Sequence, residues 1–209
     1  MTTASIKLFA GSSHAHLAQA IAKALKVPLS PIEVQRFSSG EVYAKPLVSV
    51  RDSDVFIVQT GTQFADLDLM ELFVMLDACK RSFAAKVHVV IPNFPYARQA
   101  RVAEPREPIS AKLVADLIST AGADHVITMM LHSPQAQGFF DFPVDNIPTY
   151  PLFVDYFKKR KLKDLCIVAP DMGSAKDARK LAIHLGAEIA ILNKRRIAHN
   201  VSEVTELVG

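Results

Sequence analysis

The chain has 209 residues, of which 50% are hydrophobic and 22% charged, and its 24 basic and 21 acidic residues give a formal net charge of +3. This balance is typical of a folded globular protein, and the excess of basic residues is too small to indicate a nucleic-acid partner. Without a secretory signal or an apolar stretch of the roughly 18 residues that span a membrane, and with only Cys79 and Cys166 as cysteines, we expect a cytoplasmic protein with neither membrane segment nor disulfide framework.

Short β-branched apolar runs alternate with helical patterns along the chain. We predict strands over 6–9, 54–59, 86–92 and 125–130, and helices over 14–26, 68–82 and 110–121. The pattern restarts after residue 148, with helices over 150–159 and 174–185, strands over 165–169 and 188–192, and then a polar tail. Strands that alternate with helices of ten or more residues predict parallel βαβ units. We therefore expect an α/β fold, with one domain over residues 1–148 and a second, incomplete one over 149–209.

A basic loop follows the predicted strand 86–92. Ligands of parallel sheets bind beyond the carboxyl ends of the strands, so residues in such positions are candidates for function. This loop carries Arg98, Gln99, Arg101 and Arg106 beside the aromatic residues Phe94 and Tyr96. Guanidinium groups beside aromatic rings suit a polyphosphate and a stacked base. The alternative from composition alone is a solvated basic loop.

Three further groups of polar residues follow predicted strands. His132, Asp141 and Asp145 come after strand 125–130 and could help to hold a hard divalent cation, or could be a structural histidine and two turn residues. Asp171 comes after strand 165–169, where it could bind a metal or a sugar hydroxyl, or could cap the next helix. Lys194 and Arg196 come after strand 188–192 and could stabilise a transferring phosphoryl group, or belong to a surface charge run.

Several segments together resemble the ribose-phosphate diphosphokinase family, also called phosphoribosyl-pyrophosphate synthetases. The matching segments, in the family's order, are 7–14, 36–41, 69–72, 94–99, 108–115, 137–141, 143–145, 170–171 and 194–196. The resemblance implies two phosphoribosyltransferase-like parallel-sheet domains, a homo-oligomer (dimer or hexamer), and Mg2+ as cofactor. It also implies transfer of the diphosphoryl group of Mg-ATP to ribose 5-phosphate, which gives phosphoribosyl pyrophosphate and AMP.

The resemblance also implies roles for individual residues. Arg98 and Gln99 would contact ATP, while Phe37 and Glu41 of a neighbouring subunit would hold the adenine. Asp171 would face the ribose, and Lys194 and Arg196 would stabilise the transition state. The expected catalytic residues are Lys194, Arg196 and His132, and the expected metal ligands are His132, Asp141, Asp145 and Asp171.

The sequence departs from the family's pattern at several positions, among them Ser39, Asp66-Leu67-Asp68 and Met172-Gly173-Ser174, and two more departures concern the magnesium and ATP sites directly. Met130 stands where the family has an acidic magnesium ligand two residues before the histidine, and Ala100 replaces the aspartate of the Arg-Gln-Asp motif. A thioether is a poor ligand for a hard cation. The sequence also ends before the strand that carries the family's ribose 5-phosphate loop. We therefore expect no AMP formation by this chain alone, and the alternative function is that of a non-catalytic regulatory or associated subunit.

Overall fold

Five parallel strands form the sheet of the first of two compact units, which comprise residues 1–147 and 148–209. The computed structural model describes residues 5–198 and 201–209, and the side chains of 194–205 lie outside this description. The strands of this sheet, in spatial order, are β1 (Ile6–Ala10), β4 (Asp54–Val58), β5 (Lys86–Val90), β6 (His125–Met129) and β7 (Val144–Ile147). Every neighbouring pair is parallel, so all carboxyl ends of the strands lie at one edge of the sheet.

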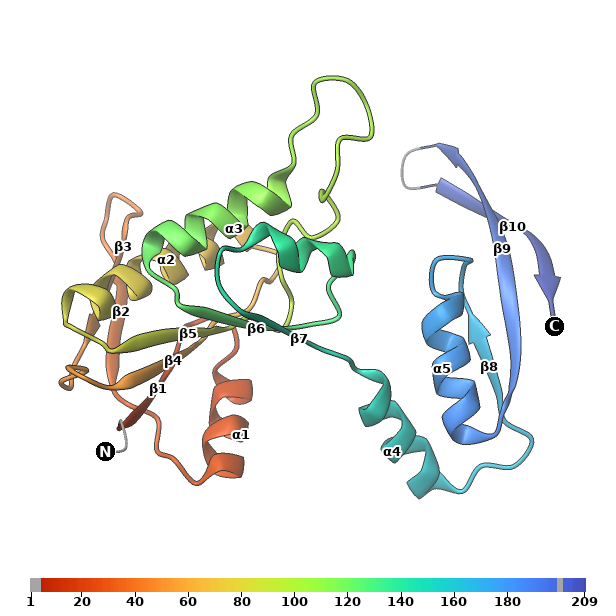
Figure 1. Ribbon diagram of the computed structural model, residues 1–209, viewed down its shortest axis with the longest axis horizontal. Helices are drawn as coiled ribbons and strands as arrows, with labels where there is room; N and C mark the ends of the chain where they lie inside the picture. The colour runs from red at the N-terminus through yellow and green to blue at the C-terminus, as the bar shows by residue number, and fades with distance from the viewer. Residues whose placement is uncertain (1–4, 199–200) are drawn as a thin grey trace. The chain divides into compact units, whose positions relative to one another are not determined.

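Helices cover both faces of this sheet because side chains alternate between the faces along each buried strand. Helices α2 (Ala65–Arg81) and α3 (Ser110–Ala121) lie on one face, and α1 (Ala15–Leu25) lies on the other (Figure 1). Phe9 and Ile57 point into the core beneath α2 and α3, whereas their neighbours Leu8 and Val58 pack with α1. The prediction of an α/β fold with a parallel sheet is confirmed.

Four elements of the first unit were absent from the sequence prediction. Strands β2 (Ile32–Arg36) and β3 (Val42–Pro46) pair as an antiparallel hairpin that contacts α2. The 3₁₀-helix η1 (Pro134–Phe139) and the strand β7 connect β6 to the end of the unit. Most hairpin side chains are at least partly exposed and only Ala44 is buried, so the sequence lacks the apolar run that marks the central strands.

The second unit contains α4 (Tyr150–Arg160), β8 (Cys166–Ala169), α5 (Ala175–Leu185), β9 (Glu188–Ala198) and β10 (Val201–Val208). β8 and β9 are parallel, but β9 and β10 pair antiparallel, so this sheet is mixed. The prediction of a polar tail after residue 192 is therefore wrong. The tail intersperses valines and a leucine with polar residues, and its backbone pairs with β9 in a register that places Leu207 opposite Leu192.

Within the residues that the structure describes, no helix combines the length and the apolar character needed to cross a membrane. The longest helix, α2, has 17 residues and carries charged side chains along its length.

A histidine pair lies on the α1 face of the sheet. The Nδ1 atoms of His88 on β5 and His125 on β6 are 3.1 Å apart, and His125 Nε2 lies 3.3 Å from Asp145 Oδ2. The His88 ring stacks on Phe56, and its Nε2 atom is buried with no hydrogen-bond partner among the described residues. Burial, together with the charge of His125 and, to a lesser extent, Lys86, lowers the pKa of His88, and the carboxylates of Asp54 and Asp124 oppose this only in part. The folded protein therefore favours the neutral form of His88.

The lowered pKa of His88 predicts a loss of stability in acid. Above about pH 6.5, the usual pKa of histidine, both folded and unfolded chains hold a neutral imidazole and the stability is full. As the pH falls below that value the unfolded chain takes up the proton first, so the free energy of unfolding decreases towards the lower pKa of the folded state. Urea unfolding between pH 5.5 and 7.5 measures this decrease. In His88→Gln the free energy of unfolding should depend less on pH. His16→Gln, at an exposed position, is the control and should keep the pH dependence of the unmodified chain. The same pH dependence in His88→Gln and the unmodified chain would contradict the role of His88.

Candidate functional site

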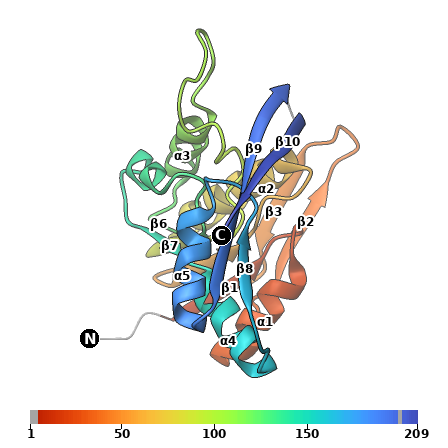
Figure 2. The same ribbon diagram turned by 90° about the vertical axis from the view of Figure 1, so that its right-hand side faces the viewer.

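A cavity of about 570 Å³ opens at the carboxyl edge of the five-stranded sheet. Its walls come from the ends of three neighbouring strands: Thr62 and Ala65 after β4, residues 93–99 after β5, and residues 129–132 at the end of β6. The loop between β5 and α3, which begins at this wall, projects beyond α3 in both views of the molecule (Figure 2). The cavity thus lies at the edge of the sheet where the sequence predicted a ligand.

The structure brings Arg98, Gln99 and His132 together in this cavity. Arg98 and His132 are exposed, and neither makes an ion pair or hydrogen bond to another described residue. Gln99 is held by α3, because its carbonyl oxygen accepts a hydrogen bond from the Ala111 amide and its Oε1 accepts one from the Ser110 hydroxyl. The five guanidinium N–H donors of Arg98 are therefore available to a ligand, and a phosphate group accepts them well.

Two residues of the cavity wall have left-handed backbone conformations. Tyr96 has φ +60° and Met130 has φ +50°, a region that residues other than glycine rarely adopt. The amide of Met130 donates to the Ile147 carbonyl, and the amide of the next residue, Leu131, donates to Asn146 Oδ1, so β7 holds this turn in place. Such conformations concentrate at ligand-binding sites, where the surrounding structure enforces them.

The predicted metal ligands do not come together. β7 runs parallel to β6, so Asp145, which pairs with Ile127, lies towards the amino ends of these strands and contacts His125 there. Asp141 is exposed just before β7, at the same amino edge, whereas His132 follows the carboxyl end of β6. Across the described residues, no group of three or more histidine, cysteine, aspartate or glutamate side chains is placed to hold a metal ion. The expectation that His132, Asp141 and Asp145 share one ion does not match this arrangement.

The cavity wall itself offers no carboxylate as a magnesium ligand. Among the residues that line it, His132 is the sole imidazole, and its neighbour Met130 contributes a thioether. Magnesium prefers oxygen ligands, so the described wall does not fit a magnesium ion held by protein side chains alone.

The remaining predicted residues are not among those that line this cavity. Phe37 and Glu41 are at the exposed tip of the β2–β3 hairpin, where Phe37 packs beside Tyr43 and Glu41 accepts a hydrogen bond from Ser39. Asp171, in the second unit, accepts a hydrogen bond from the amide of Ser174, the residue that immediately precedes α5. Lys194 and Arg196 lie on β9, and their side chains fall outside the described part of the chain.

Thr62 and Asn93 line the cavity but were not among the predicted site residues. Both follow the carboxyl end of a strand, β4 for Thr62 and β5 for Asn93, so the rule that selected Arg98 and His132 also applies to them. Thr and Asn are uncharged and common in loops, so their residue types did not indicate a phosphate or metal site. Only their position after the strands could have identified them.

Comparisons with known proteins agree on one family. A family model described as the N-terminal domain of ribose phosphate pyrophosphokinase matches residues 6–122. Ribose-phosphate pyrophosphokinases of Clostridium perfringens and Bacillus caldolyticus are 49% and 48% identical to the chain, over 98% of it and 65% of their own length. The crystal structure of phosphoribosylpyrophosphate synthetase from Mycobacterium smegmatis superposes with a TM-score of 0.89 at 38% identity, covering 98% of this chain and 67% of that one. The chain thus spans about 65% of the length of the curated relatives it matches.

Proposed function

Because the chain belongs to the ribose-phosphate pyrophosphokinase family, we propose that it carries the nucleotide-binding part of an enzyme that transfers the diphosphoryl group of ATP to ribose 5-phosphate. The products of this reaction are phosphoribosyl pyrophosphate and AMP. The observation that carries the proposal is the convergence of Arg98, Gln99 and His132 on one cavity at the carboxyl edge of the sheet.

The residues of this cavity support a mechanism based on positioning and neutralisation of charge. Diphosphoryl transfer needs the attacking hydroxyl held in line with the phosphate and its negative charge compensated, and it needs no covalent nucleophile. In this proposal Arg98 binds the triphosphate, Gln99 fixes the loop against α3, and His132 faces the phosphates from the end of β6.

For magnesium, we propose that the ion enters as part of the substrate, Mg-ATP. The cavity wall contains no carboxylate, so the phosphate oxygens and water would supply most of the ion's ligands. Asp171, Lys194 and Arg196 of the second unit are proposed to act on the ribose and on the transferred group, as the family resemblance implies.

The experiment that tests this proposal is a calorimetric titration of the 209-residue chain with ATP, followed by an assay for AMP with and without ribose 5-phosphate. AMP that forms only when ribose 5-phosphate is present would support the transferase. ATP binding without AMP would agree both with the nucleotide-binding part of the enzyme and with the second candidate, a non-catalytic regulatory or associated subunit, which the thioether of Met130 beside His132 favours. Absence of ATP binding would contradict both.

We also propose that the protein acts in the cytoplasm as a homo-oligomer, a dimer or a hexamer. Phe37 has half of its surface exposed at the hairpin tip, where an aromatic ring and the carboxylate of Glu41 are accessible to a second copy's nucleotide. Exposed aromatic side chains are enriched at protein interfaces. Light scattering should give a mass at least twice the 22.9 kDa of one chain, and a monomer at all concentrations would contradict the proposal.

A further inference from the structure

A group of hydrogen-bonded polar side chains is buried near the carboxyl ends of β1 and β4. Gln59, Asp68 and Glu71 are 1%, 9% and 3% exposed. Glu71 accepts hydrogen bonds from the amide and hydroxyl of Ser12, at 2.7 and 2.6 Å, and from Gln59 Nε2 at 3.2 Å. Each buried polar group of this kind needs its partners, since an unpaired one costs the full desolvation free energy. These side chains therefore hold the loops after β1 and β4 in fixed positions.

Asp68 makes the contact that reaches the cavity wall. Its Oδ2 atom accepts hydrogen bonds from the amide of Thr62 at 2.6 Å and from the Thr62 hydroxyl at 2.7 Å. The same hydroxyl accepts a hydrogen bond from the Phe64 amide at 3.1 Å. Thr62 lines the cavity, whereas Asp68, in the first turn of α2, does not. The buried carboxylate of Asp68 thus fixes both hydrogen-bond donors of Thr62, an exposed residue of the cavity wall.

Hydrogen bonds join this loop to the segment that carries Arg98. The amide of Gly61 donates to the Asn93 carbonyl at 3.0 Å, and Asn93 Nδ2 donates to the Gly61 carbonyl at 2.7 Å. The amide of Asn93 donates to Thr60 Oγ1 at 2.9 Å. Three hydrogen bonds therefore join the loop that Asp68 anchors to the first residue of the wall segment 93–99.

We propose that Asp68 is a positioning residue of the nucleotide site, which acts through Thr62 and Asn93 without touching the ligand. The inference rests on the proposed binding of ATP in this cavity. Binding is tight when the wall is already in its bound geometry, because ordering a loop at the moment of binding consumes free energy that would otherwise appear as affinity. Thr62 and Phe64 in the loop 60–64 are exposed, so packing alone does not order this loop. The hydrogen bonds to Asp68 order it before ATP binds, which removes the free-energy cost of ordering it on binding.

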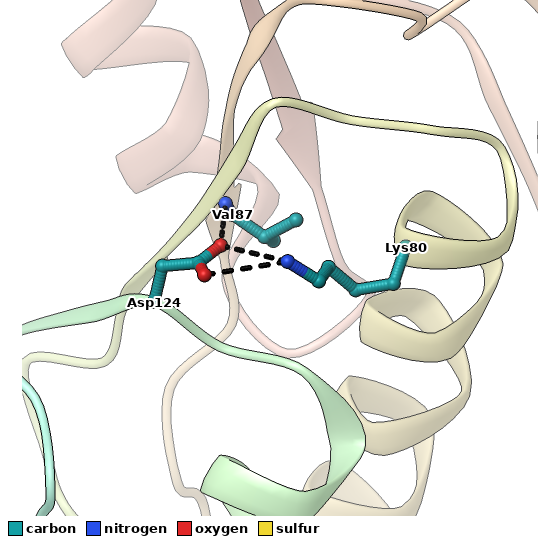
Figure 3. Close-up of polar contacts among 3 residues, drawn as sticks. All are labelled: Lys80, Val87 and Asp124. Atoms are coloured by element: carbon teal, nitrogen blue, oxygen red, sulfur yellow. Dashed lines mark hydrogen bonds and ion pairs between the residues drawn. The ribbon is translucent and has the colours of Figure 1, made fainter.

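The structure offers a matched control at the opposite edge of the sheet. Asp124 also accepts one backbone amide, that of Val87 at 2.7 Å, and one side-chain donor, the Lys80 ammonium, which lies 3.1 and 3.3 Å from its two oxygens (Figure 3). Val87 is near the start of β5 and Asp124 precedes β6, so this carboxylate is at the amino edge, away from the cavity wall. Loss of Asp124 should affect stability without affecting the nucleotide site.

The test compares the dissociation constants for ATP of Asp68→Ala, Asp68→Asn and Asp124→Ala with that of the unmodified chain, by calorimetry under conditions in which circular dichroism shows each protein to be folded. We expect Asp68→Ala to weaken ATP binding about tenfold, the loss typical of a charge-assisted hydrogen bond. Asp68→Asn should stay within about twofold, because an amide oxygen can accept both bonds from Thr62. Asp124→Ala should leave the constant unchanged while lowering the midpoint of urea unfolding.

Two outcomes overturn the positioning role: equal dissociation constants for Asp68→Ala and Asp124→Ala, or an Asp68→Asn protein as weak as Asp68→Ala. Should Asp68→Ala fail to fold, Thr62→Val removes the hydroxyl from an exposed position, and an unchanged constant for that variant contradicts the role as well. Absence of ATP binding by the unmodified chain overturns the proposed function itself, which is a result distinct from any difference among the variants.

Discussion

Replacement of Arg98 by alanine is expected to weaken ATP binding between about tenfold and a hundredfold, both with magnesium and with chelator. Arg98 is exposed in the cavity wall and makes no ion pair within the described residues, so its guanidinium has no other charge to neutralise. A contact between arginine and phosphate does not need a metal ion, which is why the loss should be the same in both conditions.

Calorimetric titration of the variant and the unmodified chain measures this loss. Arg101→Ala is the matched control, because Arg101 lies on the same exposed loop but does not line the cavity. The control should bind ATP within about twofold of the unmodified chain, apart from a small long-range effect that salt screens. Equal losses in the two variants would show that the loop attracts ATP only through its general positive charge.

The central strands and their helices could be predicted from the sequence because burial on both faces leaves a clear pattern. Strand β4 reads Asp54-Val-Phe-Ile-Val58, and every residue after Asp54 packs into one of the two cores. Helix α3 begins and ends at the residues expected from Ser110 and Gly122. Strand β10 was missed because polar residues interrupt its apolar ones, so the sequence shows neither a continuous apolar run nor a strict alternation, although the backbone pairs with β9.

The site was predictable only where it depends on strand ends. Arg98 and His132 meet because each follows the carboxyl end of a neighbouring parallel strand, which the sequence pattern indicates. Asp145 follows His132 closely in sequence, but the chain returns to the amino edge before β7 begins, so sequence proximity gave the wrong neighbour. The roles of Asp68 and Glu71 could not be predicted for another reason. A charged residue in a helical pattern predicts a solvent-exposed side chain, and only the structure shows that these two side chains are buried.

A carboxylate at position 130 is expected to make ATP binding dependent on magnesium. Met130 lines the cavity beside His132, and 44% of its surface is exposed. In the unmodified chain, ATP affinity should come from Arg98 and its neighbours and should change by less than about threefold between magnesium and chelator. In Met130→Asp, magnesium should tighten ATP binding about tenfold or more, because the new oxygen ligand bridges through the ion to the phosphates.

The backbone at this position favours the substitution. Met130 has φ +50°, a conformation that aspartate and asparagine adopt more readily than methionine, so the variant should fold at least as well as the unmodified chain. Met130→Asn is the matched control, because it shares the backbone preference and the shape of aspartate but lacks the charge. In chelator, Met130→Asp should bind ATP more weakly than Met130→Asn, since an unneutralised carboxylate repels the triphosphate.

Titrations of the three proteins with ATP, each with magnesium and with chelator, separate the two contributions. A magnesium effect of Met130→Asp that exceeds that of Met130→Asn by about tenfold would assign the difference to the carboxylate rather than to the backbone. If the unmodified chain already binds ATP only with magnesium, other residues supply the protein's contribution to the ion. In that case the thioether at position 130 does not weaken the metal site, and the expectation drawn from Met130 is wrong.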